Sequence, residues 1–201
     1  MNIFFKPFAG PYSEPKTFKE AFWRYKWTVN FIKKHWNPDW KKFLDIGHRN
    51  IFTSYLEETF GVKILNTFGD LDRKAIYPEG NFDVIFCFEV LEHLCNPLWL
   101  LDCIYEKLDS NGALFLSTPS RLQINWATCH FCEHSLDRLS YLFEKAKFVV
   151  TDRDLIKIPG SFGIRPVIRK IMGWFFFPYP EGIYLFLLKK LKNQDILLCQ
   201  R

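Results

Sequence analysis

The segment FDVIFCF, residues 82–88, is the feature that most constrains the fold of this chain. A seven-residue run that is almost wholly apolar predicts a strand buried on both faces, which is typical of a parallel sheet covered by helices on two sides. Other strand-like segments alternate with helical patterns, and this alternation predicts an α/β fold with a mainly parallel sheet. The strands are expected in KFLDIG, VKILNT, FDVIFCF, ALFLSTP, FVVTDRDLIKIP and, last, DILLCQ at residues 195–200.

Four helices are expected between these strands. Residues 14–35 carry apolar side chains at helical spacing with lysines between them, which indicates an amphipathic helix. Asn50 and Gly61 are a suitable cap and stop for a helix over residues 51–60. The sequence EVLEHL, from residue 89, is expected to open a helix that continues beyond Pro97. Ser135 can cap a fourth helix that ends near residue 146, whereas residues 69–81 are expected to form a loop.

Composition and charge limit the class of protein. The chain has 201 residues, of which 48% are hydrophobic, so it is long enough to bury the core of a single domain. Its net charge of +5 divides into +6 for residues 1–42, −7 for residues 43–152 and +6 for residues 153–201. Basic ends indicate an anionic partner or surface, with solvated lysines as the alternative. We expect six mostly free thiols in a reducing cytoplasm, since neither a secretory signal nor an 18-residue apolar span is found.

Three polar stretches come directly after predicted strands, at residues 45–50, 88–93 and 117–120. In parallel α/β sheets, ligands bind outside the carboxyl ends of the strands, where the strand order reverses. The sequence therefore predicts a binding site in which these three stretches meet.

Four segments, in this order, resemble the motifs of class I S-adenosylmethionine-dependent methyltransferases: FLDIG, GDLDRKAIYPEGNFDVIFCFEVLEHLCNP, LDSNGALFLSTPS and HFCEHSLDRLSYLFEKAKF. The match covers about residues 40–158 and is closest to the small-molecule and sugar-pathway branch. It implies a Rossmann-like, mostly parallel sheet of seven or six strands with an antiparallel last strand. The expected single domain divides into a helical cap (1–40), a cofactor-binding core (41–158), a basic and aromatic insert (159–192) and the last strand (193–201).

The resemblance also assigns residues to the cofactor. Asp45 and Gly47 would meet the methionine part of S-adenosylmethionine, although Asp45 could instead cap the next helix. A second glycine of the family falls here on Arg49, whose side chain would crowd the cofactor or force the loop outward. The segment between the second and third strands is short, so a strand or helix is expected to be missing there, and GDLD could serve the ribose and adenine or be an ordinary turn. The cofactor-binding residues implied are Asp45, Gly47, Asn66, Asp70, Leu71 and Phe88.

Candidate catalytic residues follow the strand at residues 82–88. Glu89, Glu92 and His93 have the i, i+3, i+4 spacing of one helix face, and with His130 they could hold a divalent cation. The alternative is a structural role for Glu92 and His93, and no metal is favoured. The catalytic residues implied are Glu89, His93 and His130, with His130 a candidate general base. A zinc site built on Cys129, Cys132 and His134 lacks a fourth ligand at the usual spacing and is not favoured.

Together these expectations predict an enzyme that transfers a methyl group from S-adenosylmethionine to an oxygen of a small molecule. S-adenosylhomocysteine would be the other product. The acceptor expected is a sugar, a nucleotide-sugar or a lipid-linked glycan intermediate. Residues 163–190 are basic and aromatic, and could contact a membrane surface, form a lid, make a dimer seam or fill the core. Nucleic-acid binding is not favoured, because no recognisable module is found. The alternative function is a non-catalytic binding or scaffolding protein that kept the fold.

Overall fold

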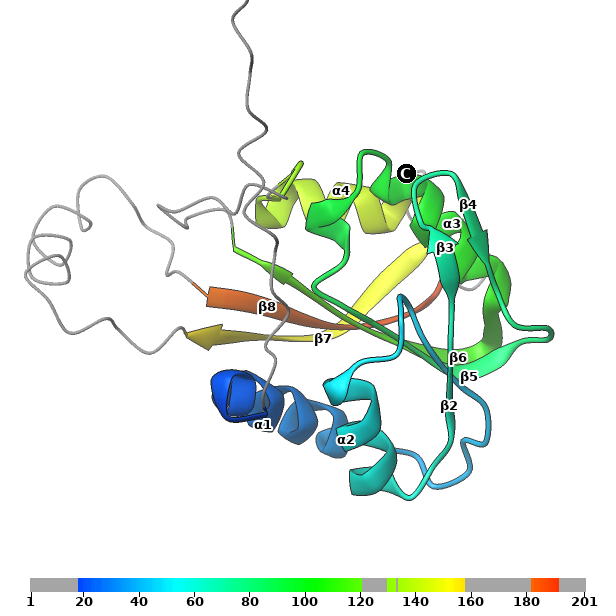
Figure 1. Cartoon of the computed structure of the whole chain (residues 1–201). Coiled ribbons are helices and arrows are strands. Elements are labelled where there is room, and N and C mark those ends of the chain that lie inside the picture. Colours follow the sequence, from blue (N-terminus) through cyan, green and yellow to red (C-terminus); the bar gives the residue numbers. More distant parts are fainter. Residues whose placement is uncertain (1–17, 121–129, 133, 158–181, 192–201) are drawn as a thin grey trace, which may run out of the picture.

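A computed structural model describes residues 18–120, 130–132, 134–157 and 182–191 (Figure 1). Its six-stranded sheet has the order β2-β1-β5-β6-β8-β7, with α1 and α2 on one face and α3 and α4 on the other. The strands are β1 (Phe43–Asp45), β2 (Ile64–Asn66), β5 (Phe82–Phe88), β6 (Leu108–Pro119), β7 (Phe148–Lys157) and β8 (Gly182–Lys190). The helices are α1 (Phe18–Lys34), α2 (Ile51–Phe60), the 3-10 turn η1 (Leu91–His93), α3 (Pro97–Lys107) and α4 (Leu136–Lys145). The predicted Rossmann-like α/β fold, with a mostly parallel sheet, is confirmed.

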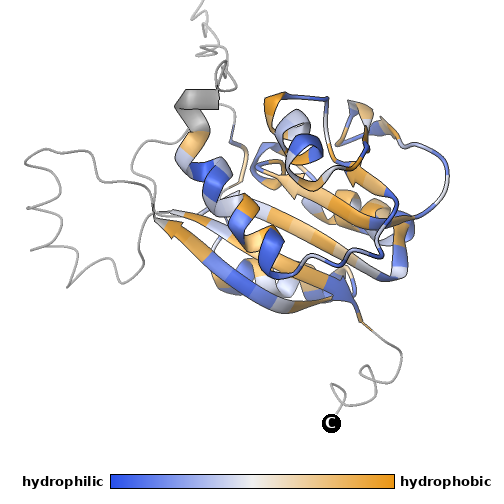
Figure 2. Ribbon diagram, turned by 90° about the horizontal axis from the view of Figure 1, so that it is seen from below, coloured by the Kyte–Doolittle hydropathy of each residue, from blue (hydrophilic) through white to orange (hydrophobic). Residues whose placement is uncertain are grey.

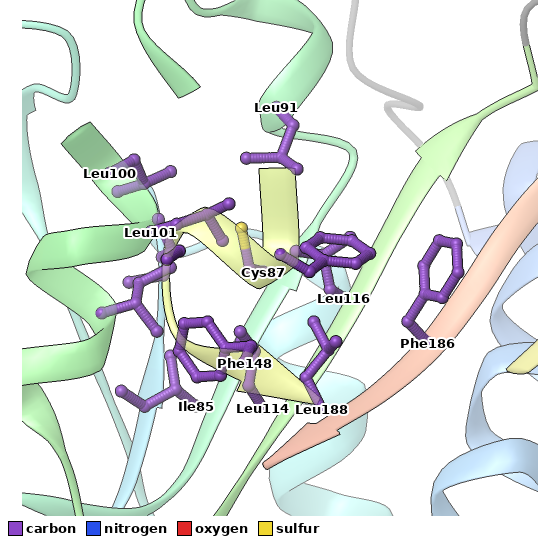
Figure 3. Close-up of a cluster of buried hydrophobic side chains, with 14 of the residues drawn as sticks. Ile85, Cys87, Leu91, Leu100, Leu101, Leu114, Leu116, Phe148, Phe186 and Leu188 are labelled. Carbon is purple, nitrogen blue, oxygen red and sulfur yellow. The ribbon is translucent and has the colours of Figure 1, made fainter. Parts of the chain in front are cut away.

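The central strand β5 shows why its sequence is apolar throughout. Ile85 and Cys87 point into the core on the side of α3 and α4 (Figure 3), whereas Val84 and Phe86 enter the core beneath α1 and α2. All four side chains are completely buried. Because burying one such side chain contributes about 1.5–3 kcal/mol, the strand can be stable only between two helical layers. The need for helices on both faces of this strand is the reason why residues 82–88 predict the fold.

The predicted helix caps are also confirmed. The Asn50 side-chain oxygen accepts hydrogen bonds from the backbone N–H groups of Phe52 and Thr53, at 2.8 and 3.0 Å. Gly61 ends α2 in the left-handed conformation, with φ of +65°. Ser135 caps α4 through the N–H of Arg138. These local signals fix where two helices begin, and the first of them sets the position of the loop that precedes α2.

A strand lies inside the segment that was predicted to be the insert. Residues 182–190, which we expected inside the basic and aromatic insert, form β8, antiparallel to both β6 and β7. Gly182–Leu188 are all buried, so this stretch is a central strand and its assignment to the insert is wrong. The two lysines at the end of this segment favoured a basic insert. The apolar run before them, however, determines that the segment forms a buried strand of the sheet. The rest of the predicted insert up to residue 181 and the predicted strand at 195–200 lie outside the described residues.

The third predicted helix is wrong at its start. Glu89 has a left-handed backbone (φ +54°), η1 is a single 3-10 turn, and α3 begins only at Pro97. The residue before a proline avoids the helical region, and proline itself suits the first helical position, so Asn96-Pro97 starts a new helix. Glu89, Glu92 and His93 therefore do not share a helix face.

The segment between β2 and β5 contains a small hairpin where a loop was predicted. Strands β3 (Phe68–Asp70) and β4 (Lys74–Ile76) pair antiparallel and form a separate two-stranded sheet. The main sheet ends at β2, which agrees with the expectation that a strand is missing from this short segment. The described cysteines Cys87, Cys95, Cys103 and Cys132 are free, as predicted. Among the helices described, none has the length and apolar character needed to cross a membrane.

Candidate active site

A cavity of about 520 Å³ opens at the carboxyl ends of β1 and β5. This volume lies in the range of small-molecule sites, about 300–1,000 Å³. The three polar stretches predicted from the sequence meet there, and α1, from the segment expected to form a helical cap, adds a fourth wall. The lining includes Arg24, Tyr25 and Thr28 of α1; Asp45, Gly47 and His48 of the first loop; Leu71 of the hairpin; and Phe88, Glu89, His93 and Ser117.

The first loop presents bare backbone to the cavity. Gly47 has φ of +106°, and a Cβ added there would meet no atom within 4 Å. The Gly47 N–H donates to the Thr67 hydroxyl at 2.7 Å, which fixes the turn. The Arg49 side chain lies outside the cavity, where it pairs with Glu57. The expected crowding by Arg49 therefore does not occur, because the loop turns this side chain toward α2.

Asp45 and Asn66 hold this loop in place. The Asp45 carboxylate accepts a hydrogen bond from the Thr53 hydroxyl at 2.5 Å, so it connects β1 to the first turn of α2. The Asn66 amide donates to the carbonyl of Gly47 at 3.2 Å. Asp45 lines the cavity, whereas Asn66 is buried beneath the loop and is not among the lining residues. Asp45 thus has both of the positions considered from the sequence. It lines the cavity, and it also stabilises the start of the next helix.

Of the two hairpin residues implied for the cofactor, Leu71 lines the cavity and Asp70 does not. The Asp70 side chain is 57% exposed and lies 3.9 Å from Arg73, away from the cavity. Asp72, the second carboxylate of the GDLD segment, is not among the described lining residues and accepts hydrogen bonds from the backbone N–H groups of Cys95 and Asn96 at 3.0 and 2.9 Å. These bonds anchor the hairpin to the chain just before α3, and they place Leu71 over the cavity.

Glu89 lies at the end of β5 in a small polar network. Its backbone N–H donates to the Ser117 carbonyl at 3.0 Å, and the Ser117 hydroxyl donates to its carboxylate at 2.7 Å. A second carboxylate oxygen lies 3.6 Å from the Arg24 guanidinium. Burial raises the pKa of Glu89, while Arg24, Ser117 and His130 oppose the rise. Arg24 could not be found from sequence, because nothing in a basic amphipathic helix tells which cation will reach a cavity.

Glu92, His93 and His130 form a cluster beside the cavity. Each offers one potential ligand atom, and these atoms lie within 4.8 Å of one another. The carbonyl of Glu92 accepts the N–H groups of Phe131 and Cys132, and these bonds bring the segment of His130 to η1. The three residues could hold a divalent cation; Glu89, the fourth candidate ligand, is not part of the cluster.

The two histidines of this cluster are in contact with each other. His93 is among the residues that line the cavity, whereas His130 is not among the described lining residues, and their ring centroids lie 4.9 Å apart. Glu92 is completely buried with the Thr118 hydroxyl at 3.2 Å, and burial raises its pKa well above the ordinary value, with a further rise from the charge of Glu89. No grouping of Cys132 with His134 that could bind zinc is found in the described part of the chain, and Cys129 lies outside it.

Comparison with known proteins identifies the family. Residues 28–155 match the family described as "Methyltransferase domain". A tRNA U34 carboxymethyltransferase of Sulfurimonas denitrificans is 26% identical over a match of 133 residues, which covers 54% of this chain and 45% of that protein. A ubiquinone biosynthesis O-methyltransferase of Histophilus somni is 45% identical over 55 residues, which are 27% of this chain and 23% of that protein. The chain thus spans less than half the length of these two relatives.

Solved structures share the fold at low sequence identity. A SAM-dependent methyltransferase from Archaeoglobus fulgidus is 16% identical with a TM-score of 0.58, and the match covers 86% of this chain and 98% of that one. An O-methyltransferase from a trans-AT PKS multienzyme of Brevibacillus brevis, in complex with S-adenosyl-L-homocysteine, is 17% identical with a TM-score of 0.52; the match covers 83% of this chain and 72% of that one. The family match covers well over half of the chain. The sheet, the glycine turn and the cavity all agree with that match. This protein therefore belongs to the methyltransferase domain family, with the class I S-adenosylmethionine-dependent fold.

Proposed function

We propose that this protein transfers a methyl group from S-adenosylmethionine to an oxygen atom of a small molecule. One observation carries the proposal: the Gly47 turn and the side chains of Glu89 and His93 line the same cavity at the carboxyl ends of β1 and β5. The turn suits a nucleotide-like cofactor, and the two side chains suit a hydroxyl that must lose its proton. The family supplies the link between them.

The cavity fits the cofactor in shape and charge. At Gly47 the open space beyond the backbone would let the methionine part approach closely, as glycine turns in such folds do. Arg24 is the only lysine or arginine among the described lining residues, and it would neutralise the amino-acid carboxylate of the cofactor. Leu71 of the hairpin would provide an apolar contact for the adenine. When bound, the cofactor supplies a methyl group activated on a sulfonium.

Aromatic side chains would exclude water from the reacting atoms. Tyr25 and Phe52 stack with ring centroids 4.3 Å apart, and Phe52 contacts Phe88 at 5.4 Å. All three line the cavity. Orientation and exclusion of water are the main contributions that a protein makes to an in-line transfer.

His93 is our candidate for the general base. Its ring lines the cavity beside Glu89, so its nitrogen could take the proton of an acceptor hydroxyl, while Glu89 would orient that hydroxyl. His130 was the candidate base from sequence. Since its ring contacts that of His93 and it is not among the described lining residues, we place it as the residue that positions the His93 ring.

The acceptor class is the finer part of the proposal. Relatives described as O-methyltransferases favour an oxygen acceptor. The basic ends of the sequence favour an anionic molecule, such as a nucleotide-sugar or a lipid-linked glycan intermediate. The free thiols described above favour action in a reducing cytoplasm.

Calorimetric titration with S-adenosylhomocysteine and S-adenosylmethionine tests the proposal. We expect saturable binding to the wild-type chain, weaker binding to Gly47→Val, and unchanged binding to Arg73→Ala, which alters an exposed side chain of the hairpin. If no binding occurs up to millimolar concentrations, the proposed function is wrong and a scaffolding role replaces it. Candidate acceptors can then be screened by the formation of S-adenosylhomocysteine.

A further inference from the structure

The outward surface of α1 carries an unusual combination of side chains. At 100° per residue, Tyr25, Thr28, Val29 and Ile32 occupy one arc and are buried against the domain. The opposite arc, which we call the outer face of α1, presents aromatic and basic residues. It consists of Phe22, Trp23, Lys26, Trp27, Asn30, Lys33 and Lys34, of which Trp23 is partly buried against the domain.

Two large aromatic side chains on this face are open to solvent. Trp27 is 55% exposed and Phe22 is 47% exposed. Figure 2, which views the molecule from below, shows hydrophobic and hydrophilic bands alternating along this helix. The buried arc of α1 docks the helix on the sheet, and Trp27 lies on the opposite side of the helix. Indole and phenyl rings at such positions gain stability when a partner removes them from water.

The charged side chains that the structure describes on the outer face are all basic. Lys26, Lys33 and Lys34 lie on it, and no acidic side chain does among the residues whose side chains the structure describes. Lys34 bonds Asp152 at 2.7 Å, whereas no ion pair of Lys26 or Lys33 is seen within the described ranges. A partner for this face must therefore be anionic and must also accept aromatic rings.

We propose that the outer face of α1 docks on a membrane surface that contains anionic phospholipids. Tryptophan and phenylalanine rings are favourable at the level of the headgroups, and lysines beside them reach the lipid phosphates. A second copy of the chain is disfavoured, because two identical basic faces repel. Single-stranded nucleic acid is bound in a groove that follows its backbone, whereas this face is the convex side of one helix.

Docking would place α1 between the cavity and the membrane. Tyr25 and Thr28, which line the cavity, lie on the buried arc, whereas the outer face would contact the lipid headgroups. The inference rests on the exposed side chains of α1 alone, and it holds or fails independently of methyl transfer.

Co-sedimentation of the full chain with vesicles tests the proposal. We expect binding to phosphatidylcholine vesicles that contain phosphatidylserine, little binding to phosphatidylcholine alone, and release by salt. A lysine near such a surface changes affinity about five-fold, so Lys26→Glu combined with Lys33→Glu should reduce binding at least 25-fold. Trp27→Ala should also weaken binding, and Trp27→Phe should retain most of it.

Matched controls come from the hairpin, which exposes a lysine and an apolar side chain elsewhere. Lys74→Glu and Ile76→Ala should bind as the wild type does, and circular dichroism should show all variants folded. Equal binding to both vesicle types, or unchanged binding of the double lysine variant, would overturn the proposal. So would a dimer that Trp27→Ala dissociates, or a single-stranded oligonucleotide that binds this face while the vesicles do not.

Discussion

Replacing Gly47 by alanine tests whether the backbone of the first loop forms the cofactor site. At φ of +106° an alanine is strained even though its Cβ would meet no atom within 4 Å, so the cost is purely conformational. Residues held in such regions cost about 1–3 kcal/mol. We expect the melting temperature to fall by roughly 2–4 °C for each kcal/mol, as is usual for a chain of about 200 residues.

The loop can escape this strain only by moving, and movement has a second consequence. The Gly47 N–H would leave the Thr67 hydroxyl, now 2.7 Å away, and the backbone would no longer face the cavity as it does. Restoring the binding geometry would then cost the same 1–3 kcal/mol. This corresponds to an affinity for S-adenosylhomocysteine that is about 5- to 150-fold lower.

Arg49→Gly is the matched control in the same loop. Arg49 pairs with Glu57 outside the cavity, and its φ is not positive, so glycine there relieves nothing. We expect the affinity of Arg49→Gly to stay within about two-fold of the wild type, which is roughly 0.4 kcal/mol. Isothermal calorimetry gives both affinities, and scanning calorimetry gives the melting temperatures. A Gly47→Ala variant that binds and melts like the wild type, or a ten-fold gain for Arg49→Gly, would refute this account of the loop.

Three further predictions concern ionisable residues. His93→Ala should lower kcat at least 100-fold with little change in cofactor affinity, whereas His130→Ala should lower it less; equal losses would argue against His93 as the base. Glu92→Gln should stabilise the fold at neutral pH. The raised pKa of Glu92 means that stability is lost as pH rises above about 4.5, a loss that the amide does not share. Thermal melts from pH 5 to 8 should show this divergence, and a less stable variant at pH 8 would contradict it. Asp152→Asn should cost about 1 kcal/mol at neutral pH by urea unfolding. Hydrogen bonds from Lys34 and, less strongly, His35 lower the pKa of Asp152 from 3.8 to about 2, so its stabilisation is present above the unfolded pKa and is lost as pH falls toward 2. A variant as stable as the wild type at pH 7 would refute this prediction.

Local signals in the sequence were sufficient for most of the fold. The apolar run of β5 and the caps of α2 and α4 depend on residues close together in the chain, and each was found where it was predicted. The start of the third helix failed because Glu89 takes a left-handed backbone, which its hydrogen bonds to Ser117 hold and which its own sequence does not favour. Tertiary contacts decide such positions.

In the candidate site, too, some residues could be placed from sequence patterns, whereas others depend on tertiary contacts. Residues at strand ends, such as Asp45, Glu89 and His93, could be placed because the carboxyl ends of parallel strands converge. Arg24 could not be placed, because its position depends on how α1, which precedes the first strand, packs on the sheet. The structural role of Asp72 could not be predicted, because its hydrogen-bond donors are backbone N–H groups, which carry no sequence signal.

The place of β8 in the sheet has a consequence for how the protein forms during translation. β7 joins the sheet through β8, which pairs with β6 on its other side. Until residue 190 leaves the ribosome, the edge of β6 stays unpaired and β7 has no strand to join, although its helix α4 has already been made. We therefore expect nascent chains that stop before Gly182 to expose the long apolar edge of β6, which makes them targets for chaperones and proteases. The sheet is thus completed only when β8 is made. Although β8 is the last of the described strands to be synthesised, it lies between two strands that are made before it.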